Sequence, residues 1–319
     1  MPCTSRMPIV SSTSTTTCIA PAKVNLCLRV TGRRDDGYHL LDSVFVAIDF
    51  SDEITITIRP PQTRGASQIS VSCDCPDVPN DATNLAARAA RTLLAETGLD
   101  ADVAITIVKR IPPGAGLGGG SSNAASVLRA VDTVLGLDIA ERRLAELALT
   151  LGADVPFFLT GGCARVRGIG EQVEAIPGWP GRSLVLALPP VAVSTAWAFR
   201  AYAAQPKPRP GDRRSVFPAA RLAAACEVLP ELLENDLESV VLPAHPAVAC
   251  AKRGLLDAGA AAAVMSGSGA AVVGLVPPGA AARALAASFA ARHPEIPVHC
   301  VRILGGAAAG SVDPTPGYP

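Results

Sequence analysis

One stretch of this 319-residue chain, Ile111-Pro-Pro-Gly-Ala-Gly-Leu-Gly-Gly-Gly-Ser-Ser-Asn-Ala-Ala125, limits the possible folds more than any other. Five of its residues are glycines, whose backbone can adopt positive φ and approach a ligand without a Cβ clash. Ser121 and Ser122 stand where N-caps belong, before apolar residues at helical spacing and Gly136 as a stop signal. Unpaired N–H groups at a helix start attract anions. The stretch therefore predicts a phosphate-binding loop, and we interpret it as a nucleoside triphosphate site.

Two other phosphate-binding loops match this stretch only in part. A Walker A loop requires lysine where Gly120 stands. The dinucleotide-binding pattern G-x-G-x-x-G does fit, after a predicted strand at 102–108 and with Asp138 near the expected acid. That pattern also needs a second strand, whereas the apolar residues of 139–151 have helical spacing. A flexible linker is a further alternative, which the flanking strand and helix disfavour.

Composition excludes several classes of function. The 28 basic and 28 acidic side chains balance, so no basic field would hold nucleic acid or a membrane surface. No apolar run reaches the ~18 residues of a membrane span. Nine cysteines without a C-x-x-C pair argue against a disulfide framework or a zinc site. We therefore expect a cytoplasmic protein with no nucleic-acid or membrane partner. The sequence leaves the oligomeric state open, between a monomer and a weak homodimer.

The first half of the chain reads as strands followed by helices, an order that indicates an α+β fold. Residues 19–30 alternate as a strand does, with Lys23 and Asn25 on the less apolar face. That face is either solvated in the ordinary way or part of a site. The hydroxyl-rich residues 1–18 are expected to be disordered. Further predicted elements are strands at 42–50, 53–58 and 102–108 and helices at 83–97 and 139–151.

The second half has the strand-helix-strand-strand-helix-strand order of a ferredoxin-like domain. Its predicted strands are 183–188, a hairpin within 262–275, and 298–304, and its predicted helices begin at Thr195 and span 246–257 and 280–292. We therefore divide the chain into a disordered extension (1–18), an N-terminal domain (19–165), a C-terminal domain (166–304) and a flexible tail (305–319). Asp154 precedes an apolar run near the boundary, either as a cap or as a carboxylate at the lip of a site.

Three motifs together resemble the GHMP kinases, the superfamily of galactokinase, homoserine kinase and mevalonate kinase. They are Pro21-Ala-Lys-Val-Asn25, Pro113-Gly-Ala-Gly-Leu-Gly-Gly-Gly-Ser-Ser122 and Ser266-Gly-Ser-Gly269. Thr31-Gly-Arg-Arg-Asp-Asp-Gly-Tyr-His39 and Leu151-Gly-Ala-Asp-Val-Pro156 add a likeness to the 4-diphosphocytidyl-2-C-methyl-D-erythritol kinase family. The likeness covers about residues 19–304. The chain departs from the family pattern in its longer N-terminal extension, its short glycine-proline tail, and a serine at 268 where threonine is commoner.

This resemblance implies a two-domain architecture, with an N-terminal domain like ribosomal protein S5 domain 2, a ferredoxin-like C-terminal domain, and an active site between them. The implied reaction transfers the γ-phosphate of ATP, with Mg²⁺, to the 2-hydroxyl of the small-molecule substrate, a cytidine diphosphate-linked methylerythritol of the non-mevalonate isoprenoid pathway. By resemblance Asp154 is the general base and Lys23 its partner. Two alternatives stay open: the same chemistry on a mevalonate- or homoserine-like alcohol, and a non-catalytic ATP- and sugar-binding sensor.

The resemblance also implies which residues hold each ligand. Tyr38 matches the stacking tyrosine of the family, with Phe199 as the second wall of a cytosine slot and His39 as the reader of its edge. Trp197 and Tyr202 compete with Phe199 for that role. The metal ligands are left open, with Ser121 or Ser122 as candidates. The expected nucleotide-binding residues are Pro113, Gly114, Ala115, Gly116, Leu117, Gly118, Gly119, Gly120, Ser121 and Ser122, and those for the acceptor are Asn25, Tyr38, His39, Thr195, Phe199 and Gly267.

Overall fold

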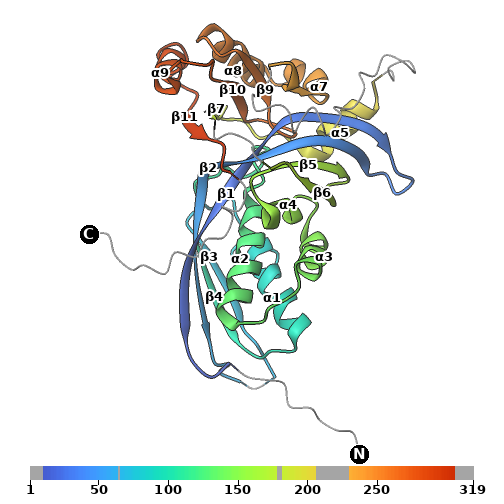
Figure 1. Cartoon of the computed structure of the whole chain (residues 1–319), viewed down its shortest axis with the longest axis vertical. Coiled ribbons are helices and arrows are strands. Elements are labelled where there is room, and N and C mark those ends of the chain that lie inside the picture. The colour runs from blue at the N-terminus through green and yellow to red at the C-terminus, as the bar shows by residue number, and fades with distance from the viewer. Residues whose placement is uncertain (1–9, 64, 178–181, 206–229, 306–319) are drawn as a thin grey trace, which may run out of the picture.

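The computed structural model describes residues 10–63, 65–177, 182–205 and 230–305, and consists of two sheets with helices packed against each (Figure 1). The larger sheet has the order β3-β4-β2-β1-β8, and β5 and β6 extend it from β2. Its strands are β1 (Ser14–Arg33), β2 (His39–Arg59), β3 (Ile69–Cys73), β4 (Asp102–Val108), β5 (Cys163–Gly168), β6 (Gln172–Ala175) and β8 (Glu234–Asn235).

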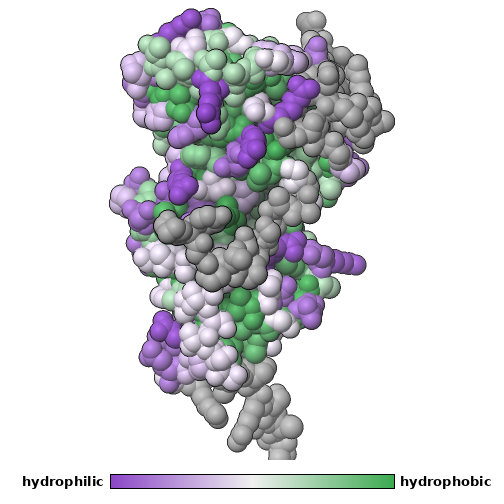
Figure 2. All heavy atoms as spheres, turned by 60° about the vertical axis from the view of Figure 1, so that its left-hand side comes forward, coloured by the Kyte–Doolittle hydropathy of each residue, from purple (hydrophilic) through white to green (hydrophobic). Residues whose placement is uncertain are grey.

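The long antiparallel pair β1 and β2 runs from the half of the molecule that contains α1 and α2 to the half that contains the smaller sheet (Figure 1). In the lower half, Ile54, Ile56 and Ile58 of β2 are fully buried against helices. The alternating Thr55 and Thr57 face outward and bond the hydroxyls of threonines on β1. Much of the lower half of Figure 2, which turns this side forward, is accordingly pale or purple rather than green. The period of two in the sequence thus sets which face of the sheet carries the core.

Four helices cover the buried face of the larger sheet: α1 (Leu85–Thr97), α2 (Gly119–Leu135), α3 (Glu141–Leu151) and α4 (Val155–Thr160). The helix α1 ends at Thr97, as the predicted helix 83–97 does, and Gly98 after it is left-handed, as is Gly136 after α2. No second parallel strand follows α2, because α3 comes next in the chain. The dinucleotide-binding alternative is therefore wrong.

The smaller sheet is antiparallel throughout and has the order β11-β7-β10-β9. This is the ferredoxin-like arrangement that the element order predicts. Its apolar residues form one core with the helices and a second core against the larger sheet. The elements of this half are β7 (Ser183–Ala187), α5 (Thr195–Ala203), a 3-10 turn (Pro230–Leu232), α7 (Glu238–Ala244), α8 (Pro246–Asp257), β9 (Ala262–Met265), β10 (Val272–Leu275), α9 (Ala282–Arg292) and β11 (Val298–Arg302).

Two sequence expectations are corrected by these elements. The expected disorder of 1–18 is wrong at its C-terminal end, because β1 begins at Ser14, where β-branched threonines pair with β2. The strands expected at 42–50 and 53–58 are one strand, β2, bent at an irregularity of its pairing with β1. Residues 1–9 and 306–319 lie outside the described residues, and the domain boundaries stay predictions. Within the described ranges, every helix is too short or too polar to cross a membrane.

Candidate active site

A cavity of about 520 Å³ lies where the glycine stretch, β1 and the smaller sheet meet. Residues from both halves of the chain line it, so neither sheet alone forms the site. The lining residues that the sequence singles out are Lys23, Asn25, Pro113, Gly114, Ala115, Gly116, Leu117, Gly118, Gly119, Gly120, Ser121, Asp154, Thr195, Phe199 and Gly267.

Lys23 projects from β1 into this cavity, although its residue is only 3% exposed. Its ammonium donates a hydrogen bond to Asn25 Oδ1 at 2.6 Å and lies 4.7 Å from the centre of the Phe45 ring. Asn25 is two residues along the strand, on the same face as the period of two predicts. Burial lowers the pKa of Lys23, because desolvation disfavours the charged form. The Asp154 carboxylate opposes this shift.

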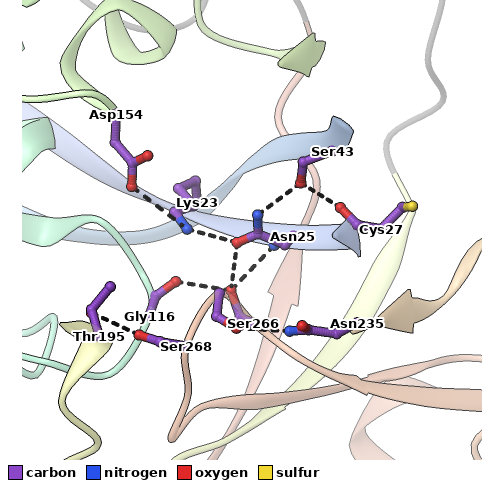
Figure 3. Close-up of polar contacts among 11 residues, drawn as sticks. Lys23, Asn25, Cys27, Ser43, Gly116, Asp154, Thr195, Asn235, Ser266 and Ser268 are labelled. Atoms are coloured by element: carbon purple, nitrogen blue, oxygen red, sulfur yellow. Dashed lines mark hydrogen bonds and ion pairs between the residues drawn. The ribbon is translucent and has the colours of Figure 1, made fainter. Parts of the chain in front are cut away.

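Asp154 occupies the N-cap position of the short helix α4. Its side chain makes no capping hydrogen bond, so the cap alternative does not account for it. One carboxylate oxygen instead lies 3.7 Å from Lys23 Nζ, and the side chain remains 34% exposed on the cavity side (Figure 3). The fold therefore places Asp154 beside Lys23, the two residues that the sequence resemblance pairs.

A hydrogen-bond network joins β1 to the serine-glycine turn that follows β9 (Figure 3). Asn25 Nδ2 donates to Ser43 Oγ at 2.9 Å, and the Asn25 backbone N–H donates to Ser266 Oγ at 3.2 Å. The Ser266 hydroxyl donates in turn to Gly116 O at 2.9 Å. Asn25, Ser43 and Ser266 are buried, so these bonds satisfy side-chain polar atoms that water cannot reach. The network fixes the glycine stretch against both sheets.

The glycine stretch takes backbone conformations that other residues rarely adopt. Gly114, Gly116 and Gly118 have φ of 69°, 77° and 70°. A Cβ on Gly116 would lie 2.1 Å from Ser266 O, so the close contact between loop and turn requires glycine there. The predicted serine caps are wrong: α2 begins at Gly119, and its N-cap is Gly118, three residues before Ser121. The left-handed glycine lets the helix start early, with its first N–H groups beside the cavity.

The two serines that follow have different environments. Ser121 lines the cavity. Ser122 is fully buried, and its Oγ has no hydrogen-bond partner among the described residues. Mg²⁺ prefers oxygen donors, and the Ser121 hydroxyl lies in the cavity lining beside the start of α2, so the residues present fit a magnesium ion.

The expected acceptor residues do not all lie in the cavity. Thr195 and Phe199 on α5 line it, and Thr195 Oγ1 is 2.8 Å from Ser268 Oγ in the turn after β9. His39 is outside the lining but stacks on Phe199, with ring centres 5.1 Å apart. Its Nε2 is buried without a partner, and burial and the Arg33 charge lower its pKa. Tyr38 is 62% exposed and does not reach the lining in this structure.

Sequence reasoning missed several residues of the site. Ser43 supports Asn25, and the segments 77–79 and 83–85 form one wall of the cavity. These residues carry no local signal, since they face the site only because distant segments pack beside them. The turn-rich composition of 77–84 would at most have indicated a loop. Among the described residues, no group of three or more His, Cys, Asp or Glu side chains is arranged to hold a metal ion.

Comparison with known proteins agrees with this geometry. Models of the GHMP kinase N-terminal domain and C-terminal region match residues 84–162 and 217–294. The 4-diphosphocytidyl-2-C-methyl-D-erythritol kinase of Gloeobacter violaceus is 42% identical over 85% of this chain and 89% of its own length. That of Geobacter metallireducens is 45% identical over 80% and 87%.

A solved structure is similar as well. The crystal structure of a 4-(cytidine 5'-diphospho)-2C-methyl-D-erythritol kinase superposes with a TM-score of 0.72 and 34% identity, covering 91% of this chain and all of that one. The chain therefore belongs to the GHMP kinases, in the family of 4-diphosphocytidyl-2-C-methyl-D-erythritol kinases.

Proposed function

We propose that this kinase transfers the γ-phosphate of ATP to the 2-hydroxyl of 4-diphosphocytidyl-2-C-methyl-D-erythritol, with Asp154 as the general base and Lys23 as its partner. The observation that carries the proposal is the 3.7 Å approach of Lys23 Nζ to Asp154 in the cavity that the glycine stretch also lines. Phosphoryl transfer depends mainly on alignment and charge stabilisation, and these residues offer both.

The acceptor hydroxyl is a weak nucleophile until its proton is removed. As its oxygen bonds to the γ-phosphorus, the bond from that phosphorus to the β-γ bridging oxygen breaks, and ADP leaves. Asp154 takes the hydroxyl proton, because a carboxylate within hydrogen-bond reach lowers the barrier to this step. Its part-exposed carboxylate lines the cavity, where the acceptor would enter.

Lys23 serves two purposes in this proposal. Its ammonium pairs with the Asp154 carboxylate, and it offsets negative charge on the phosphoryl group during transfer. The hydrogen bond to Asn25 Oδ1 holds the ammonium in place, and Asn25 is held in turn by Ser43. Preorganised charge of this kind costs no rearrangement at the moment of reaction.

The glycine stretch and the start of α2 bind the phosphates of ATP. Their backbone N–H groups and the helix dipole attract anions, and the positive φ values allow the backbone to approach closely. Ser121 is the residue that would hold Mg²⁺. Bound there, the ion would neutralise charge on the phosphate oxygens.

The cytosine of the acceptor binds at the α5 end of the cavity. Phe199 offers a ring face, and the unpartnered Nε2 of His39 offers a hydrogen bond at its edge. Tyr38 supplies the opposite face when its exposed ring turns toward the substrate. An alcohol without cytosine, such as mevalonate or homoserine, gains nothing from these groups.

A panel of acceptors tests this function directly. The cytidylated methylerythritol, mevalonate and homoserine are each incubated with ATP, with and without Mg²⁺, and ADP formation is followed. We expect Mg²⁺-dependent ADP formation with the cytidylated acceptor and a product heavier by one phosphate. Turnover of mevalonate or homoserine instead would overturn the acceptor assignment, and binding of ATP without turnover of any acceptor would indicate a sensor.

A further inference from the structure

A buried carboxylate on β2 holds both ends of the glycine stretch. Asp52 is 0% exposed and accepts four hydrogen bonds. Its Oδ1 accepts from the backbone N–H groups of Arg110 and Ile111, each at 2.8 Å. Its Oδ2 accepts from Asn123 Nδ2 at 2.9 Å and from the Lys109 ammonium. A buried charge is tolerated when it is bonded in this way.

The four donors come from the two sides of the nucleotide-binding residues. Residues 109–111 lead from β4 toward the nucleotide-binding residues 113–122, and Asn123 lies in the first turns of α2, directly after them. One carboxylate therefore fixes the distance between the entrance and the exit of the loop. Hydrogen bonds to a charged acceptor are stronger than neutral ones, so this link is stiff.

Lys109 is part of the same unit. Its side chain is 5% exposed and lines the cavity. A Cβ placed on Gly119 would lie 2.8 Å from Lys109 Nζ, so the ammonium rests directly against the first residue of α2. A positive charge at this place adds to the attraction of the helix start for anions.

We propose that Asp52 is a positioning residue for the phosphate donor: it sets the shape of the glycine stretch and keeps the Lys109 ammonium at the start of α2. Asp52 is outside the cavity lining and acts only through these groups. The inference rests on the proposed role of the glycine stretch in binding ATP. Its consequence is specific, because loss of Asp52 weakens binding of the donor and leaves the acceptor end of the cavity intact.

A purely structural role for Asp52 predicts something else, namely lower stability with unchanged ATP affinity. The chain offers a matched control in Asp42, which is also buried and also on β2. Its carboxylate pairs with Arg165 through hydrogen bonds of 2.9 and 2.8 Å. Among the described residues, it bonds no group of the glycine stretch, unlike Asp52. Asp42→Asn therefore breaks a comparable buried ion pair without touching the loop.

The experiment compares Asp52→Asn, the double variant Asp52→Asn with Lys109→Met, and Asp42→Asn in the full chain. Thermal unfolding, the KM values of ATP and of the acceptor, and calorimetric binding of a non-hydrolysable ATP analogue are measured. Asp52→Asn is expected to raise the KM of ATP about tenfold or more, with the acceptor KM within about twofold of wild type. Asp42→Asn should lower the unfolding temperature and leave the KM of ATP unchanged.

The double variant covers the case in which the single variant does not fold, because it leaves no unpaired ammonium in the interior. Its KM for ATP should also be raised, since the charge beside Gly119 is lost. A wild-type KM for ATP in whichever Asp52 variant folds overturns the inference. The proposed function fails in a different way: the wild-type protein would then not bind the ATP analogue, or would form no ADP with the acceptor.

Discussion

The Lys23 ammonium lies 3.7 Å from the Asp154 carboxylate, although one residue belongs to the first strand and the other precedes the fourth helix. Burial on β1 removes water from the lysine, whereas the aspartate stays 34% exposed toward the cavity. The pair therefore combines a fixed, desolvated cation with an acid that an incoming hydroxyl can reach. A general base must be reached by the acceptor hydroxyl, whereas its cationic partner must stay in place, and the different exposure of the two side chains meets both needs.

Asp154→Asn should lower kcat by about 100-fold or more, the range covered by loss of a general base. The amide has the same shape but cannot accept the proton. Binding of ATP should persist, because the glycine stretch is unaltered, and calorimetry with an ATP analogue measures this. Full activity in the asparagine variant would show that another group removes the proton.

Lys23→Met should abolish most turnover yet leave the fold at least as stable at neutral pH. The folded-state pKa of Lys23 lies below the ordinary value of 10.5, so the charged form is disfavoured by folding. Between these two values the unfolded chain binds more protons, and stability rises with pH. Below the folded-state pKa the cost of burying the charge is fully present.

Thermal unfolding measured from neutral to alkaline pH tests whether the buried charge of Lys23 destabilises the fold. The advantage of Lys23→Met over wild type should be greatest at neutral pH and should shrink as pH approaches 10.5. A methionine variant that is less stable than wild type across the whole range would mean that the pair with Asp154 outweighs the desolvation of Lys23.

The acceptor end should show its own pH dependence through His39. Its lowered pKa keeps the imidazole neutral at pH 7, with one nitrogen able to donate and the other to accept. The KM of the cytidylated acceptor should therefore be constant above pH 6.5 and rise only in more acidic solution. Glutamine does not titrate in this range, so the acceptor KM of His39→Gln should be higher than that of wild type but independent of pH. The same acid rise in the glutamine variant would assign the effect to another group.

Tyr38→Ala tests the second wall of the cytosine slot. The ring is exposed in the structure and has no packing role to lose, so stability should not change. We expect a higher KM for the cytidylated acceptor and an unchanged KM for ATP. An unchanged acceptor KM would remove Tyr38 from the site and leave Phe199 and His39 as its aromatic groups.

Local patterns in the sequence predict many of these elements well. The alternation of 102–108 gives β4 with its observed bounds, and 246–257 is a helix as its spacing and first proline indicate. The ferredoxin-like sheet follows from element order alone. Lys23 and Asp154 could be paired because motif resemblance supplied the contact, which neither residue's own surroundings reveal.

Other features depend on distant partners and leave no local pattern. Asp52 stands between two predicted strands, as a turn residue would, whereas its four donors lie in residues 109–111 after β4 and at Asn123 in α2. The serine-cap preference at 121–122 is overridden because Gly118 reaches a left-handed conformation that starts the helix earlier. The strand at 14–18 forms because threonines on β2 lie opposite, which composition alone cannot indicate.

Two glycines of the same loop permit a final test of how tightly the loop is packed. Gly114 and Gly116 have nearly equal φ, 69° and 77°, so replacement by alanine costs each the same ~1–2 kcal/mol of backbone strain. Only the Gly116 variant has a further steric clash. An alanine Cβ at position 116 would lie 2.1 Å from Ser266 O, whereas nothing lies within 4 Å of a Cβ at position 114. Gly116→Ala must therefore push the loop away from the turn after β9 and break the bond from Ser266 to Gly116 O.

We expect the unfolding temperature of Gly116→Ala to fall well below that of Gly114→Ala, with loss of ATP-analogue binding measured by calorimetry. Equal unfolding temperatures for the two variants would mean that loop and turn separate freely, and that the site closes only when its ligands bind.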